Sequence, residues 1–126
     1  MRHVLIVGLM LAVAQPVFAA EQDIGAAFSA CMEQAGGVTM AMIDCMGTEY
    51  QRQDVRLNKV YQELMSGLSS ERKQQLQKAQ RLWLKFRDAN CDFYYDPDGG
   101  SLARVNANDC FMMATEARAK ELEGFR

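Results

Sequence analysis

The side chains that could do chemistry in this chain begin with four cysteines, Cys31, Cys45, Cys91 and Cys110. An even number of cysteines is typical of a disulfide framework in an exported protein, and four of them allow three pairings. We predict Cys31–Cys45 and Cys91–Cys110, because each bond then closes a short loop between neighbouring elements, worth roughly 3 kcal/mol in the chain-entropy model. None of the spacings resembles the close CxxC pairs of structural zinc sites, which disfavours a metal site.

The carboxylates lack the partners that catalysis needs. Asp54, Asp88, Asp92, Asp96 and Asp98 are available, but the one histidine, His3, lies at the extreme N-terminus. A glycosidase needs two carboxylates across a cleft, which a small helical bundle rarely provides. A calcium loop needs a twelve-residue pattern closed by a glutamate, which the 96–100 turn lacks. The sequence therefore predicts a non-enzymatic protein with no cofactor and no metal.

The methionines leave one alternative to that prediction. Met40, Met42 and Met46 lie close together, and Met112 and Met113 are adjacent further along the chain. Soft thioethers can hold Cu(I) in a periplasm, but methionine more often fills irregular gaps in a core. We favour core packing and keep copper binding as an open alternative.

Residues 1–19 have the layout of a secretory signal peptide, with a basic start, an apolar run at 4–14 and small residues before a cleavage point after Ala19 or Ala20. The apolar run is too short to cross a bilayer, and no cysteine follows the cleavage point to carry a lipid anchor. We expect residues 20–126 to form one domain, exported as a soluble protein to a bacterial periplasm.

The charge balance constrains the partner. The chain has 14 Lys and Arg against 16 Asp and Glu, and loss of Arg2 with the signal peptide brings the net charge to about −3. A nucleic-acid-binding domain would carry a basic excess, so nucleic acid is excluded as a main partner. A mild acidic excess instead favours a basic partner.

The elements that must position these residues are all helical. Apolar residues recur at helical spacing, and glycine, serine and Asp-Pro signals separate four segments. We predict helices over 23–35, 39–66, 70–95 and 102–123, with Thr39 and Ser101 as N-caps of the second and fourth. No alternating strand pattern is present. The predicted fold is all-α, a small antiparallel bundle of about four helices stapled by two disulfides.

Polar residues interrupt the apolar stripes of these helices. On the third helix the stripe centred on Trp83 includes Phe86 and Tyr94, but also Arg87, about 40° from Trp83 at 100° per residue. A buried unpaired charge costs several kcal/mol, so inward-facing polar groups should find one another. We predict that Arg87 donates a bidentate hydrogen bond to Asp54 and that Arg118 also reaches an inner carboxylate. The full predicted polar cluster is Asp54, Asn58, Arg87, Asn90 and Arg118. The alternative is that Arg87 extends along Trp83 to reach water.

Three motifs together resemble a known family. The second helix carries ExxxxDxxLNxxYxxL from Glu49 to Leu64, and the third carries LxxAQRxWxxFRDxxC from Leu76 to Cys91. The last carries CxxxxTxxRxxEL from Cys110 to Leu122. This combination resembles the lysozyme inhibitor LprI-like N-terminal domain family of small exported bacterial proteins. The resemblance implies a compact, disulfide-bearing envelope domain that inhibits lysozyme, the muramidase that cuts peptidoglycan. Membrane anchoring is not implied here, because a lipobox cysteine is absent.

A partner-binding surface is expected on the turn after the third helix. Tyr95, Asp96, Asp98, Gly99 and Gly100 combine an aromatic anchor and negative charge on a base held by the Cys91–Cys110 bond. The alternative is an ordinary helix–helix turn with Tyr94 packed inside. The predicted function is a periplasmic binding protein that inhibits lysozyme. The alternative function is an envelope protein that binds another protein or a wall component without inhibiting lysozyme. The sequence leaves the oligomeric state open.

Overall fold

The computed structural model describes residues 24–125, which form four α-helices and no strand. Helix α1 runs over Ala26–Ala35, α2 over Thr39–Ser66, α3 over Ser70–Tyr94 and α4 over Gly100–Glu123. This confirms the all-α prediction and places most helix ends within two residues of the predicted ones. The predicted signal peptide lies outside the described residues. None of the described helices combines the length and apolar character needed to cross a bilayer.

Local sequence explains where the helices begin and end, although two predicted caps are wrong. Gly36 ends α1 in the left-handed conformation, and the hydroxyl of Ser69 accepts a hydrogen bond from the backbone N–H of Arg72 at the start of α3. Thr39 and Ser101, in contrast, lie inside their helices, and neither α2 nor α4 has a side-chain cap. The residue just before α2 is instead Val38, and the one just before α4 is Gly99.

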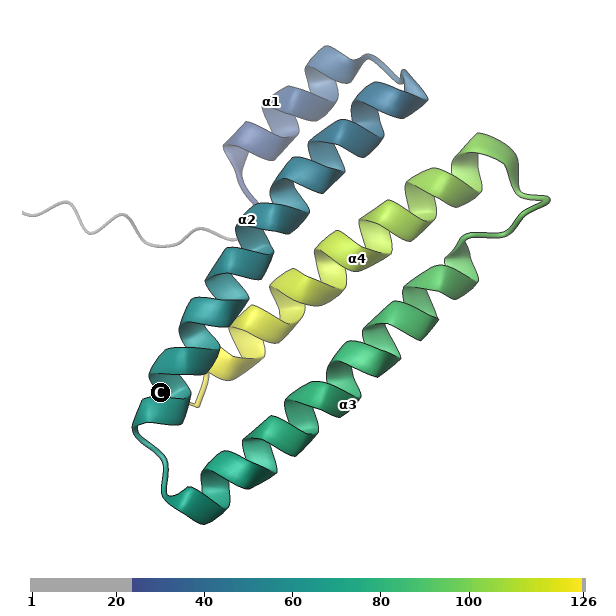
Figure 1. Ribbon diagram of the computed structural model, residues 1–126. Helices are drawn as coiled ribbons and strands as arrows, with labels where there is room; N and C mark the ends of the chain where they lie inside the picture. Colours follow the sequence, from purple (N-terminus) through teal and green to yellow (C-terminus); the bar gives the residue numbers. More distant parts are fainter. Residues whose placement is uncertain (1–23, 126) are drawn as a thin grey trace, which may run out of the picture.

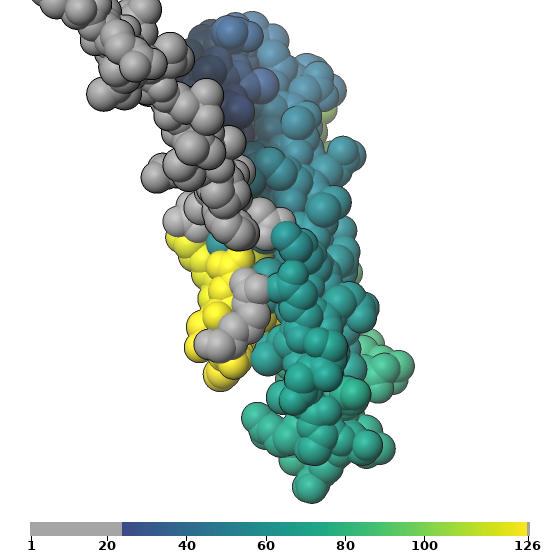
Figure 2. Space-filling view, turned by 90° about the vertical axis from the view of Figure 1, so that its left-hand side faces the viewer, coloured from purple at the N-terminus to yellow at the C-terminus, as the bar shows by residue number. Residues whose placement is uncertain are grey.

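Helix α4 lies between α2 and α3 and packs against both (Figure 1). Its closest packing is against α2, α3 rests mainly on α4, and α1 packs on α2. Consecutive α2 and α3 therefore do not approach each other closely along their backbones. In the space-filling view, α2 runs along the molecule with the C-terminal end of α4 beside it (Figure 2). The result is an elongated bundle in which α3 is a peripheral helix.

The core is centred between α2 and α4. Leu57 and Val60 of α2 meet Ala119 and Leu122 of α4, and all four side chains are buried. Four half-buried side chains close the cluster, including two from α3: Tyr61, Leu64, Leu76 and Trp83. Met46 and Met112 are also buried, as predicted, whereas Met40 and Met113 are exposed. Core packing thus accounts for Met46 and Met112 but not for Met40 and Met113.

Both predicted disulfides are confirmed. Cys31–Cys45 attaches α1 to α2, and Cys91–Cys110 attaches the C-terminal part of α3 to α4. The second bond turns the Arg87 and Cys91 side of α3 toward α4. This rotation explains why the predicted α3 stripe is partly wrong: Phe86, expected inside, is 64% exposed, and Tyr94 is about half exposed.

Candidate functional site

Arg87 lies in a box of aromatic rings contributed by three helices. Its guanidinium carbon is 5.2 Å from the ring centre of Trp83 on its own helix, 5.7 Å from Tyr50 of α2 and 5.6 Å from Phe111 of α4. These distances are within the range of cation–π attraction. The side chain is only 7% exposed. The prediction that Arg87 is buried is therefore confirmed, and the alternative of a side chain extended into water is excluded.

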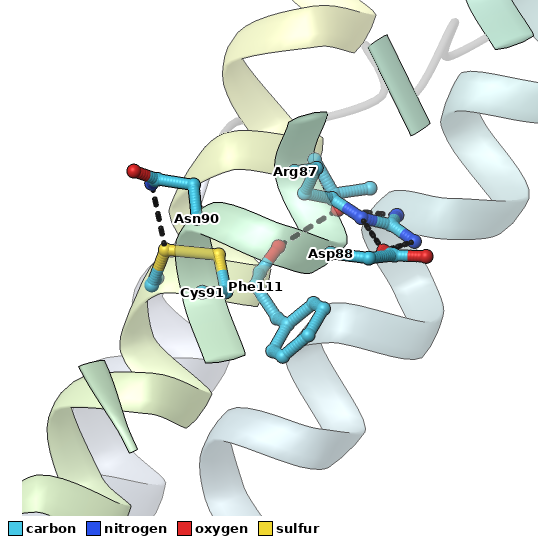
Figure 3. Close-up of a disulfide and its surroundings, with 7 residues drawn as sticks. Arg87, Asp88, Asn90, Cys91 and Phe111 are labelled. Carbon is cyan, nitrogen blue, oxygen red and sulfur yellow. Dashed lines mark hydrogen bonds and ion pairs between the residues drawn. A yellow bond between two sulfur atoms is a disulfide. The ribbon is translucent and has the colours of Figure 1, made fainter. Parts of the chain in front are cut away.

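The carboxylate that Arg87 binds is Asp88, not Asp54. Arg87 Nε and Nη2 donate to Asp88 Oδ1 at 3.0 and 2.8 Å, and Nη1 donates to the hydroxyl of Thr115 at 3.2 Å. Thr115 in turn donates to the carbonyl oxygen of Phe111 at 2.7 Å. Figure 3 shows the guanidinium facing Asp88, with the Cys91–Cys110 disulfide one helical turn away. The buried guanidinium is thus held by acceptors on both α3 and α4.

The predicted polar cluster does not form, and its members other than Arg87 lie in three separate places. Asp54 lies at the edge of α2 and accepts a hydrogen bond from Asn58 of the same helix at 3.3 Å. Asn90 faces the sulfur of Cys110 at 3.6 Å (Figure 3). Arg118 donates to Gln80 of α3 at 3.0 Å and to the exposed carboxylate of Glu121 at 2.6 Å, so its partner is not an inner carboxylate.

Rotation of α2 explains why Asp54 does not reach Arg87. The side of α2 that meets α4 carries Gln53, Arg56 and Val60, all buried, together with Leu57. At 100° per residue, this side is centred about 50° from Leu57, in the direction away from Asp54 and Asn58. Asp54 is consequently half-buried and Asn58 exposed.

A polar network that the sequence analysis missed connects α2 with α4. The guanidinium of Arg56 is buried and makes a bidentate contact with Glu123 of α4, at 2.9 and 2.7 Å, and it also donates to Gln53 at 3.1 Å. Gln53 donates to Glu49 at 2.8 Å, and Arg52 donates to the same carboxylate at 2.9 Å. The spacing of three and four residues among these α2 side chains was the signal that could have revealed the network.

The network sets the ionisation of Glu49. Burial raises the pKa of Glu49, but hydrogen bonds from Arg52 and Gln53 and the charges of Arg52 and Arg56 outweigh it. The pKa therefore lies below its ordinary value of 4.5. Because the folded-state pKa is depressed, the charged form stabilises the fold fully above about pH 4.5 and less as the pH falls through the folded-state pKa.

Substitution of Glu49 tests this pH dependence. We expect Glu49→Gln to lower the free energy of unfolding at pH 7, and we expect the deficit relative to wild type to shrink as the pH falls below 4.5. Urea unfolding of both proteins at several pH values measures this difference. A deficit that stays constant down to the acid limit would show that Glu49 stabilises the fold without its charge. Exposed Glu33, replaced by Gln, is a control for the general effect of losing a carboxylate.

The turn between α3 and α4 projects from one end of the molecule (Figure 1). The Asp96 carboxylate accepts a hydrogen bond from the backbone N–H of Asp98 at 2.9 Å, and the Asp96 carbonyl accepts one from Gly99 at 3.0 Å. Gly100 has a φ of +63°, and a Cβ on Gly99 would lie 2.7 Å from the Cβ of Ala103. The turn is therefore shaped by its own side chains and requires glycine at both positions.

The surface of this turn is acidic and aromatic. Asp96 and Asp98 are exposed, and so are Phe93, Tyr94 and Tyr95. The ordinary-turn alternative is wrong in placing Tyr94 inside the bundle, because Tyr94 is about half exposed and its ring meets Phe93 edge-on. Whether the turn binds a partner stays a prediction. All five predicted turn residues are exposed together at a base held by the Cys91–Cys110 bond, namely Tyr95, Asp96, Asp98, Gly99 and Gly100.

The remaining surface offers an open apolar groove of about 400 Å³ between the α2–α3 connection and the end of α4. Leu64, Leu68 and Leu76 line one part of it, and Arg118 and Phe125 line another. Among residues 24–125, no three His, Cys, Asp or Glu side chains gather as a metal site. The buried polar groups thus serve the bundle, and the exposed acidic turn is the candidate site for a partner.

Comparison with known proteins agrees with the motif pattern. A family model described as "Lysozyme inhibitor LprI" matches residues 31–122, from the first bonded cysteine to Leu122 in the core. An uncharacterized protein of Rhizobium meliloti (strain 1021) is 27% identical over 93 residues, which cover 63% of this chain and 67% of that protein. No solved structure matches the chain.

Proposed function

Because the chain belongs to the lysozyme inhibitor LprI family, we propose that it is a periplasmic, non-enzymatic protein that binds and inhibits lysozyme. The observation that carries the proposal is the family match across all four helices. The two disulfides fit an oxidising compartment such as the periplasm. Inhibition there would protect peptidoglycan from the muramidase.

We assign the contact with lysozyme to the α3–α4 turn. An inhibitor of a cleft enzyme needs a projecting element that enters or covers the cleft, and a rigid element does so without a large ordering cost. Two features make this turn rigid, namely its internal hydrogen bonds at Asp96 and the adjacent Cys91–Cys110 bond. The exposed ring of Tyr95 beside it is the kind of side chain that dominates binding energy at interfaces.

Charge supports the same assignment. Asp96 and Asp98 give the turn two negative charges, and Asp92 adds a third one helical turn earlier. Many lysozymes are basic, so an acidic turn would accelerate encounter through long-range attraction. The association rate of the complex should therefore fall as the salt concentration rises.

Variants of the turn test the proposal. With purified, oxidised mature protein, we expect Tyr95→Ala to weaken inhibition of a sensitive lysozyme by roughly tenfold or more. We expect Asp96→Asn with Asp98→Asn to slow association several-fold, mostly at low salt. The amide oxygen introduced by Asp96→Asn can still accept the backbone hydrogen bond of the turn, so this variant removes charge while keeping the local geometry. Inhibition of peptidoglycan hydrolysis and binding kinetics measure the two effects.

A matched control keeps the charge change but moves it to the opposite end of the molecule. Glu63→Gln with Glu71→Gln removes two exposed carboxylates near the α2–α3 connection, far from the turn in Figure 1. We expect this control to inhibit like wild type. Equal inhibition by the control and by both turn variants would refute the turn as the contact. Failure of the wild-type protein to inhibit any lysozyme class at micromolar concentration would favour the alternative, an envelope protein that binds another partner.

A further inference from the structure

The outward side of α3 carries an apolar stripe that is not buried against any other helix of the bundle. Its members, which we call the outer α3 stripe, are Leu82, Phe86, Ala89 and Phe93. All four are exposed, and the three large ones are exposed by 58%, 64% and 85% in chain order. Single exposed apolar residues need no explanation, but a row of them on one side of a helix marks an interaction surface.

The spacing of the stripe is that of a helix–helix seam. The steps between its members are four, three and four residues, the alternation that places side chains at the a and d positions of a coiled coil. Around the helix axis, Phe86 points about 100° away from its buried neighbour Arg87. A partner that covers the stripe can therefore be another helix, placed against α3 without displacing α4.

We propose that the partner is a second copy of this chain, with the two α3 helices antiparallel about a two-fold axis between residues 87 and 88. In this register the stripe maps onto itself. Phe86 of each copy meets Ala89 of the other, and Leu82 meets Phe93 of the other. Each layer at the centre thus pairs a large side chain with a small one, which fills space without voids. A parallel pair would instead place Phe86 on Phe86 and Ala89 on Ala89, leaving a crowded layer beside a hollow one.

Charges along the edge of the stripe favour the same register. Lys85 and Asp92 are both exposed on one flank of the stripe. They are seven residues apart, a rise of about 10 Å along the helix, so they cannot pair within one chain. In the antiparallel register, Lys85 of each copy lies on the same flank as Asp92 of the other, offset by two residues or about 3 Å along the helix axis, at the positions where coiled-coil helices exchange ion pairs. A two-fold axis makes this favourable contact twice.

The interface is short, and this sets the expected affinity. The stripe extends over about 17 Å of helix, so the buried area lies at the low end of specific interfaces. We expect a monomer–dimer equilibrium with a dissociation constant in the range of about 10 µM to 1 mM. Concentration of the protein in a confined periplasm would then control its assembly.

Sedimentation of the oxidised mature protein over that concentration range tests the proposal. We expect the mass to rise from monomer toward dimer. Phe86→Glu should raise the dissociation constant at least tenfold, because the substitution occurs twice at the centre of the interface. Val55→Glu is the matched control, since Val55 is 68% exposed on α2 and lies outside the stripe; it should leave the equilibrium unchanged.

Reversal of the charge pair tests the register. Lys85→Glu and Asp92→Lys should each weaken the dimer by about tenfold, because each places like charges opposite each other twice. The double variant should restore wild-type association. A wild-type protein that stays monomeric throughout, a dimer that survives Phe86→Glu, or a double variant that remains as weak as the single ones would each overturn the proposal. If Phe86→Glu instead weakens binding to lysozyme while the wild type stays monomeric, the stripe belongs to that contact and not to a second copy.

Discussion

Replacement of both Cys91 and Cys110 by Ala is expected to lower the free energy of unfolding by about 3 kcal/mol. The bond spans 19 residues of sequence, and Cys91 is fully buried. Helix α3 rests mainly on α4, and beyond Arg87 its large side chains Phe93 and Tyr94 are exposed, so few other contacts hold its last turns in place. Loss of the bond should therefore free the end of α3 and the turn that follows it.

The Cys31–Cys45 bond provides the comparison. It spans 14 residues, so its effect on the entropy of the unfolded chain is similar. Helix α1, however, buries only Ala35 among its residues and packs mainly on α2. We expect replacement of these two cysteines by Ala to release α1 locally and to leave the α2–α4 core nearly as stable as before.

Hydrogen exchange and urea unfolding distinguish the two variants. Without Cys91–Cys110, amide protection should fall along the C-terminal part of α3, and the urea midpoint should drop. Without Cys31–Cys45, protection should fall in α1 alone. If both variants lose protection over the whole chain and equal amounts of stability, α1 and α3 unfold as parts of one cooperative unit and the distinction is wrong.

Replacement of Arg87 by Met is expected to lower the free energy of unfolding by about 2–3 kcal/mol. Methionine retains much of the apolar volume but removes the cation from three aromatic rings and the hydrogen bond to Thr115. Asp88→Asn should cost less than about 0.5 kcal/mol, because the Asp88 side chain is 55% exposed and its ion pair is screened by water. Urea unfolding measures both, and the fluorescence of Trp83 reports the change around the ring.

The ratio of these two losses of unfolding free energy decides whether Arg87 stabilises the fold mainly through the aromatic rings or through its ion pair with Asp88. A large loss for Arg87→Met with a small one for Asp88→Asn identifies the aromatic box as the main source of stability. Equal losses would show that the ion pair with Asp88 dominates instead. Asp54→Ala serves as the control, since Asp54 contacts Asn58 on its own helix and makes no hydrogen bond to Arg87. This variant should be nearly neutral.

Local signals in the sequence were sufficient for the helices, the disulfides and the exposed turn. Glycine, serine and Asp-Pro signals between the helices act within a few residues, so they predict helix ends without knowledge of the tertiary fold. The cysteine pairing followed for the same reason, because both bonds close short loops between adjacent elements. The turn at Tyr95 to Gly100 was predictable because Asp-Pro and Gly-Gly interrupt a helix, and its residues are exposed in the structure.

The partners of the inward-facing polar groups were not predictable in the same way. Helical periodicity indicates which residues share a side of a helix, but rotation by about 40–60° around the axis is compatible with the same pattern. The orientation of α2 in the structure differs from the predicted one by such a rotation. Asp54 therefore lies at the edge of α2, and Arg56 lies beside Glu123. The orientation of α3 differs from the predicted one in the same way, so Arg87 lies between Trp83 and Phe111 and Phe86 is exposed.

The sequence by itself thus determined that this is an all-helical, doubly cross-linked protein of the LprI family with a buried arginine on its third helix. The tertiary structure alone decided which side of each helix faces inward, because that depends on the position of α4 between α2 and α3. Packing of α4 against α2 selects Gln53, Arg56 and Val60 for the interior, and the Cys91–Cys110 bond fixes the rotation of α3. The same rotation leaves Leu82, Phe86 and Phe93 exposed, since a helix at the edge of the bundle can bury only one side.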